Sequence, residues 1–278
     1  MIINTLRLIR LKDWLKNSII FLPIVFSGNL LNSYLYIDLF FSFLIFSLTS
    51  SIIYIINDLN DLEDDKNHKI KKYKKPLASG DLSRKYAYFL LVSISLLTII
   101  LFFLNSNSIH NHIFLYLIIN LSYSTFFKKI PFFEIFLICV GYLIRLDVGS
   151  YVIGVETSFL LSACIFSLSS FVISIKRLLE INNQNTNRKK IKFYSSLTIQ
   201  VITVCSAISF LIFSLLFFII SNKILILIFP FLIFIFYRYF KTATNLNMGE
   251  FPIELILKDK ILMLSSFLVI IFTIYLYI

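Results

Sequence analysis

The stretch YIINDLNDLEDDKNHK, residues 54–69, joins a long apolar run to a lysine-rich one. It concentrates a third of the fifteen acidic residues within eight positions: Asp58, Asp61, Glu63, Asp64 and Asp65. Ionised groups are costly inside a bilayer, so an apolar run that ends in charges is typical of a membrane helix reaching the water interface. The stretch therefore predicts a helix end with a polar site beside it.

The rest of the chain fits a membrane protein. Of its 278 residues, 58% are hydrophobic and 15% are charged, and the apolar residues form runs of about 20, enough to cross a bilayer. There are nine such runs: 17–33, 36–56, 86–104, 111–127, 133–154, 158–175, 195–219, 223–240 and 261–278. We expect an all-α, polytopic integral membrane protein with nine transmembrane helices, and a single domain over residues 1–278.

The basic residues predict the orientation. With nine spans, five segments share the N-terminal side, and they hold 24 of the 26 Lys and Arg residues; only Arg145 and Lys223 lie elsewhere. Such an excess indicates the cytoplasmic side. We therefore expect a multi-pass protein of the plasma or inner membrane, with a cytoplasmic N-terminus and an external C-terminus. The charge suits anionic lipid, whereas a nucleic-acid function lacks a soluble domain to carry it.

The acidic cluster suggests a metal site. If the helix continues past residue 56, Asp58, Asp61 and Asp65 fall on one face, and Asn57 adjoins it. Oxygen donors without His or Cys favour a hard cation such as Mg²⁺, which usually completes its shell with substrate phosphates. The alternative is a solvated acidic patch balanced by the lysines that follow.

Several polar residues at the cytoplasmic helix ends could bind phosphates. Lys75 precedes the turn PLASG, and Lys16 and Asn17 stand at the mouth of the first span. Tyr123 and Lys128 end the fourth span. A positive cytoplasmic loop, a snorkelling lysine and an interfacial tyrosine are the ordinary explanations.

Two further groups of charges lie in a predicted span or directly after one. Arg145 is in the middle of one, which indicates either a function or an ion pair, with Asp147 or with an acid on another helix. Lys176, Arg177 and Glu180 end the sixth span, with Lys176 and Glu180 spaced to pair. They form either an ordinary helix end or an anion clamp opposite the acidic cluster.

The sequence resembles the UbiA superfamily of membrane prenyltransferases, because NDLNDLEDD matches its NDxxDxxxD motif at Asn57, Asp58, Asp61 and Asp65. It is most similar to the branch that transfers phosphoribosyl groups to decaprenyl phosphate. The segments that carry this similarity are DWLKN at 13–17, KPLASG at 75–80, YSTFFKKIP at 123–131, GYLIR at 141–145, KRLLE at 176–180 and EFPIELILKDK at 250–260.

The resemblance implies a UbiA-like helical bundle and a Mg²⁺-dependent transferase. Prenyl-transferring members carry a second aspartate-rich motif where this chain has Lys176 and Arg177, which favours phosphoribosyl diphosphate and a polyprenyl phosphate as substrates. The resemblance implies metal ligation by Asn57, Asp58, Asp61 and Asp65, and catalytic roles for Asp58, Asp61, Tyr123 and Lys128. The expected substrate-binding residues are Lys16, Asn17, Lys75, Arg145, Lys176, Arg177 and Glu180.

Two other functions stay open at this point. The first is transfer of a prenyl group from a prenyl diphosphate to an aromatic or other acceptor. The second is transport, although the sequence lacks the inverted repeat typical of transporters. Prenyl length and oligomeric state are also left open.

Overall fold

The computed structural model describes residues 1–67, 71–104, 109–125, 127, 130, 132–182, 195–246 and 252–277. Helices make up the ordered elements of these ranges, which contain no strand. The N-terminal half contains α1 (Ile2–Leu8), η1 (Leu11–Phe21), α2 (Leu22–Phe26), α3 (Ser33–Asn60), α4 (Leu62–Lys66), α5 (Lys71–Lys74), α6 (Pro76–Ser79), α7 (Arg84–Leu104) and α8 (His110–Thr125). The C-terminal half contains α9 (Phe133–Val152), α10 (Phe159–Asn182), α11 (Ser196–Ser221), η4 (Lys223–Ile228), α12 (Phe229–Leu246), α13 (Pro252–Lys258) and α14 (Lys260–Tyr277).

The predicted all-α membrane fold is confirmed, whereas the count of nine spans is not. Six helical segments of the described chain are long and apolar enough to cross a bilayer: Ser33–Asn60, Arg84–Leu104, Phe133–Val152, Phe159–Ile181, Ser196–Ser221 and Lys223–Asn245. The other three predicted runs are helical but shorter or broken. The 16 residues of α8 extend about 24 Å, less than a hydrocarbon core of about 30 Å. The first run divides into η1 and α2 at Leu22, directly before Pro23.

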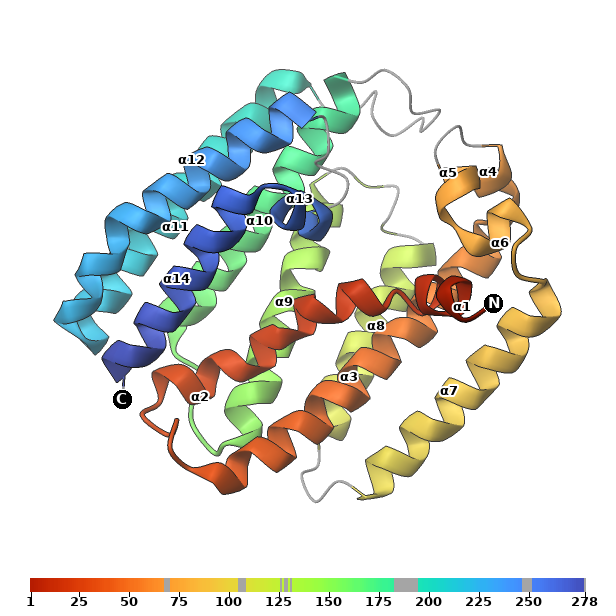
Figure 1. Ribbon diagram of the computed structural model, residues 1–278, viewed down its shortest axis with the longest axis horizontal. Helices are drawn as coiled ribbons and strands as arrows, with labels where there is room; N and C mark the ends of the chain where they lie inside the picture. The colour runs from red at the N-terminus through yellow and green to blue at the C-terminus, as the bar shows by residue number, and fades with distance from the viewer. Residues whose placement is uncertain are drawn as a thin grey trace.

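The long helices run side by side from one end of the bundle to the other (Figure 1). In the view of Figure 1, α4, α5 and α6 cluster at the upper right end, while α2 and the C-terminus lie toward the lower left. The helix α10 packs between α9 and α11, and α3 packs on α7, α8 and α9. Short helices occupy the segments between the long ones: α4, α5 and α6 follow α3, and α13 precedes α14.

One glycine allows an unusually close contact between elements. A Cβ atom added at Gly149 of α9 would lie 2.0 Å from the Ile20 carbonyl oxygen of η1. The backbone of η1 therefore rests directly on α9. This contact fixes the segment that carries Lys16 and Asn17 against the bundle.

Candidate active site

The acidic cluster forms where α3 gives way to α4. Asp61 interrupts the helix, but its N–H still bonds to the Asn57 carbonyl at 2.9 Å, and the Asp65 N–H bonds to the Asp61 carbonyl at 2.9 Å. The near-helical path brings Asp58 and Asp65 to the same cation. Lys75 Nζ lies 2.8 Å from Asp58 Oδ1 and donates to Asp65 Oδ2. Both carboxylates are buried, at 4% and 3% exposure, and Asp61 is half-buried between them along the chain.

Local sequence explains the position of Lys75. It is extended, with φ −98° and ψ 120°, as the residue before a proline prefers. Pro76 then starts α6, and Gly80 ends it with φ 85°, a left-handed conformation that favours glycine. Because the apolar residues of this turn, Leu77 and Ala78, are buried, the turn holds Lys75 over the acidic face.

Arg10 is a second cation at Asp58, a role that no local pattern in the sequence indicates. Its Nη2 lies 2.8 Å from Asp58 Oδ1, and its guanidinium stacks over the Tyr54 ring at 4.5 Å. Burial is the largest single influence and acts to lower the pKa of Arg10, but the charges of Asp58, Tyr54 and Asp13 and the hydrogen bond to Asp58 together outweigh it, so the pKa lies above its usual value. Arg10 has φ 53°, a conformation that costs about 1–3 kcal/mol at such residues and often marks a functional site.

The acidic face suits a hard divalent cation. In the described chain, no group of three His, Cys, Asp or Glu side chains is assembled as a metal site. However, Mg²⁺ usually binds through one or two carboxylates together with substrate phosphates. Asp58 and Asp65 supply two carboxylates, and the ammonium of Lys75 shows that they converge on a single positive charge. The two carboxylates therefore fit a Mg²⁺ ion that replaces the Lys75 ammonium between them.

A second polar group links α8, α9 and α10. Arg177 binds Glu134 through Nη2 and Glu180 through Nη1, and all three side chains are buried. Tyr123 donates to Glu134 Oε1 at 3.0 Å. A hydrogen bond of 2.7 Å from Ser124 to Asn57 Oδ1 connects this group with the acidic face.

These contacts change the interpretation of the α10 end. Glu180 pairs with Arg177 on the same helix. Both terminal nitrogens of Arg177 bind glutamates, while Lys176 is half-buried. Lys128 lies outside the described residues. Glu134, a buried acid on α9, belongs to this group, and sequence reasoning missed it because its partner is 43 positions away.

The intramembrane arginine has neutral partners among the described residues. Arg145 donates to Asn17 Oδ1 at 2.7 Å, to the Gly141 carbonyl at 2.6 Å and to the Tyr116 hydroxyl at 3.0 Å. The predicted alternative of a pair with Asp147 is wrong. Side chains two positions apart on a helix point in different directions. The Asp147 carboxylate binds instead to His112 at 3.1 Å and to Thr157 at 2.6 Å.

Asn17 and Lys16 belong to the same N-terminal segment but differ in surroundings. Asn17 is almost fully buried and donates to Ser47 Oγ at 2.9 Å while accepting from Arg145. It therefore joins η1 to α3 and α9. Lys16 is half-buried, and its Nζ lies 2.8 Å from Asp13 Oδ1.

Comparison with known proteins identifies the class to which this helical bundle belongs. Residues 20–248 match the UbiA prenyltransferase family. The chain is a member of that family, and so it is a multi-pass membrane protein of the transferase class.

A more specific relative is decaprenyl-phosphate phosphoribosyltransferase from Corynebacterium glutamicum. It is 29% identical over 182 residues, which is 63% of this chain and 54% of the relative. The match thus spans about half the length of that protein.

Solved structures support the fold. A UbiA homolog from Archaeoglobus fulgidus bound to DMAPP and Mg²⁺ gives a TM-score of 0.68 at 17% identity, covering 95% of this chain and 98% of that one. A digeranylgeranylglyceryl phosphate synthase gives a TM-score of 0.64 at 17% identity, covering 99% and 98%. At such identity the similarity establishes the fold alone.

Proposed function

We propose that the protein transfers the 5-phosphoribosyl group of phosphoribosyl diphosphate to a polyprenyl phosphate and releases diphosphate. The observation that carries the proposal is the contrast between its two polar groups. One is an acidic face on which Asp58 and Asp65 share Lys75. The other, on α10, has Lys176 and Arg177 where the family resemblance leads us to expect a second aspartate-rich motif. The similarity to the phosphoribosyltransferase of C. glutamicum supports the same reaction.

The metal role belongs to the acidic face. Asn57, Asp58, Asp61 and Asp65 would hold Mg²⁺, which when bound supplies charge neutralisation for the diphosphate as it leaves. Lys75 neutralises the carboxylates without metal, with its Nζ 2.8 Å from Asp58. When Mg²⁺ takes its place at the carboxylates, the Lys75 ammonium would bind the substrate phosphates instead.

The basic side chains would position the two phosphate-bearing substrates. We assign phosphate contacts to Lys16, Lys75, Lys128 and Lys176. Because its terminal nitrogens bind Glu134 and Glu180, Arg177 acts as a positioning residue that holds the group containing Tyr123. Arg145 and Asn17 fix η1 against the bundle, and so position Lys16.

The reaction needs little proton transfer. An anionic oxygen of the lipid phosphate forms a bond to C1 of the ribose, while the bond from C1 to the diphosphate oxygen breaks and the diphosphate takes the electron pair. Because the nucleophile is already charged, no strong general base is required. Positioning and electrostatic stabilisation would account for most of the rate.

The second candidate is prenyl transfer to an aromatic or other acceptor. The family match favours it, as do solved homologs that bind DMAPP or GPP with Mg²⁺. That reaction would use the same acidic face for a prenyl diphosphate. The two candidates therefore differ in donor and acceptor, and an assay can separate them.

The test uses purified protein in lipid vesicles with Mg²⁺, polyprenyl phosphate and phosphoribosyl diphosphate labelled in the ribose. We expect label in the lipid fraction, and none after chelation of the metal. Asp58→Asn and Asp61→Asn should each lower the rate by about 100-fold or more. Asp64→Asn is the matched control, because Asp64 is an exposed acid of the same run. Full activity of both site variants would remove the metal-site argument.

A further inference from the structure

A basic cavity lies outside the groups described above. It has a volume of about 440 Å³ and lies where α12 ends and α14 begins. Its walls come from Arg238, Lys241, Thr242, Asn245, Lys258, Asp259, Lys260 and Ile261. Four basic side chains thus face the cavity with a single acid. A strong net positive charge in one cavity favours an anionic ligand.

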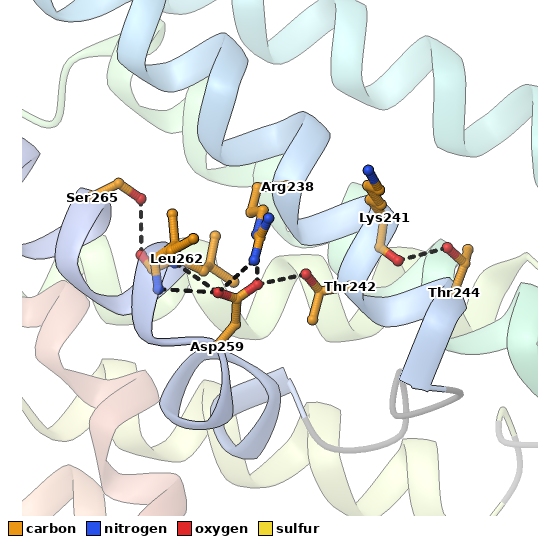
Figure 2. Close-up of polar contacts among 8 residues, drawn as sticks. Arg238, Lys241, Thr242, Thr244, Asp259, Leu262 and Ser265 are labelled. Atoms are coloured by element: carbon orange, nitrogen blue, oxygen red, sulfur yellow. Dashed lines mark hydrogen bonds and ion pairs between the residues drawn. The ribbon is translucent and has the colours of Figure 1, made fainter.

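The acid of this cavity, Asp259, has a structural role. As Figure 2 shows, Asp259 lies between Arg238 and Thr242. It binds Arg238 Nε at 2.7 Å and Thr242 Oγ1 at 2.6 Å, and it caps α14 by accepting from the N–H groups of Ile261 and Leu262 at 3.1 Å each. This network fixes the wall of the cavity and joins α12 to α14.

Exposed apolar stripes continue from the cavity along both helices. On α12, Phe231 and Phe234 share the face of Arg238 through spacings of three and four, and they are 53% and 43% exposed. On α14, the stripe begins at the cavity residue Ile261 and continues through Leu264, Leu268 and Ile271, all about half exposed. The two stripes thus lie on helices that pack against one another, and each begins beside a residue that lines the cavity, Arg238 or Ile261.

We propose that this cavity binds the phosphate headgroup of an anionic phospholipid, with its acyl chains along the α12 and α14 stripes. The charge fits a phosphate that no amine of its own lipid neutralises, because Lys241 and Lys260 line the cavity beside Arg238, which Asp259 binds. Two neighbouring apolar stripes fit a lipid with two chains. Basic pockets between helix ends at the membrane surface recognise anionic headgroups by this chemistry. The proposal does not rest on the transfer reaction.

Native mass spectrometry of the full chain in detergent tests the proposal, with phosphatidylglycerol as the probe and phosphatidylethanolamine as the neutral comparison. We expect one retained phosphatidylglycerol on the wild type and weaker retention of phosphatidylethanolamine. The double variant Lys241→Gln with Lys260→Gln removes two exposed charges of the cavity, and its dissociation constant for phosphatidylglycerol should rise at least fivefold. The charge-preserving variant Lys241→Arg with Lys260→Arg should restore binding.

The matched control is Lys66→Gln with Lys85→Gln, which removes the same charge from exposed lysines away from the cavity. It should retain phosphatidylglycerol like the wild type. Equal retention by the cavity variant and this control would overturn the proposal. So would equal retention of the two phospholipids, full displacement of the lipid by millimolar inorganic phosphate, or a cavity-dependent preference for polyprenyl phosphate.

Discussion

At Asp58, two cations from different segments meet one carboxylate oxygen: Arg10 Nη2 and Lys75 Nζ each lie 2.8 Å from Oδ1. A buried carboxylate needs such partners, because an unpaired charge in low dielectric is costly. Of the two, Lys75 also contacts Asp65. The lysine therefore competes with any metal for the same pair of oxygens.

Lys75→Gln should make the protein more dependent on Mg²⁺ for stability. Without the ammonium, Asp58 and Asp65 repel one another, and a divalent cation relieves that repulsion. We expect Mg²⁺ to raise the midpoint of thermal unfolding more in the variant than in the wild type, by several degrees. Lys72→Gln, a change at an exposed lysine of the same loop, should respond like the wild type. An equal Mg²⁺ response in all three proteins would contradict metal binding at these carboxylates.

Arg177→Met should strongly destabilise the fold. The change leaves Glu134 and Glu180 buried without the guanidinium that binds both, and breaking a buried pair costs about 3–5 kcal/mol. Denaturant titration in detergent measures the loss in the free energy of unfolding. Adding Glu134→Gln and Glu180→Gln removes both uncompensated charges and should recover most of the lost free energy of unfolding. A triple variant no more stable than Arg177→Met would show that charge pairing is not the cause.

At the scale of the element, η1 depends on its contact with α9. Gly149→Ala would place a methyl group 2.0 Å from the Ile20 carbonyl oxygen, so the two backbones must separate. We expect a loss of about 1–3 kcal/mol in the free energy of unfolding, and lower activity because Lys16 and Asn17 move with η1. Gly141→Ala is the matched control on the same helix, since its methyl group would meet its nearest neighbour, Arg145 Nη1, at 3.4 Å, an ordinary contact. Equal stability of the two variants would argue against the close contact.

The junction of α12 and α14 should respond to pH through Asp259. The bond from Arg238 holds the pKa of Asp259 well below its usual range, helped by Thr242 and the N–H of Leu262. A carboxyl group whose pKa is lowered by folding stabilises the folded state above its unfolded pKa of about 4 and loses that contribution as the pH falls below it. Asp259→Asn should therefore lower the midpoint of thermal unfolding at pH 7, and the difference should shrink toward pH 3. A difference independent of pH would contradict the ionic role.

Periodicity and composition predicted where the helices lie better than which side chains contact one another. The apolar run before Asp58 and the signals around Pro76 and Gly80 act locally, so the end of α3 and the turn of α6 follow from sequence. The contacts of the site do not. Arg10 lies 48 positions from Asp58, and Asn17 lies 128 positions from Arg145. Such pairs depend on how helices pack, which no local pattern encodes.

For the whole molecule, the described helices support six spans by length and composition, while the apolar runs of the sequence predict nine. The difference between the two counts comes from three segments: the predicted span at residues 17–33, α8 and α14. We propose nine crossings, with the N-terminus and the acidic face in the cytoplasm and the C-terminus outside. The 24 basic residues on one side are the reason.

Reporter fusions test this orientation in a bacterial host. Alkaline phosphatase, which folds only outside the cytoplasm, should be active at the C-terminus, and a green fluorescent protein at the N-terminus should fluoresce. The reciprocal fusions serve as controls. Active phosphatase at the N-terminus, or fluorescence at the C-terminus, would contradict the proposed topology.

The chain belongs to the UbiA prenyltransferase family, and its central open question is the group that it transfers. The most direct measurement offers one sample of the protein phosphoribosyl diphosphate, a prenyl diphosphate, a polyprenyl phosphate and an aromatic acid together with Mg²⁺. Mass spectrometry of the products then identifies what has moved. We predict a polyprenyl phosphate that has gained one phosphoribosyl group, with diphosphate released in equal amount. An unchanged polyprenyl phosphate beside a prenylated aromatic acid would contradict the proposed function.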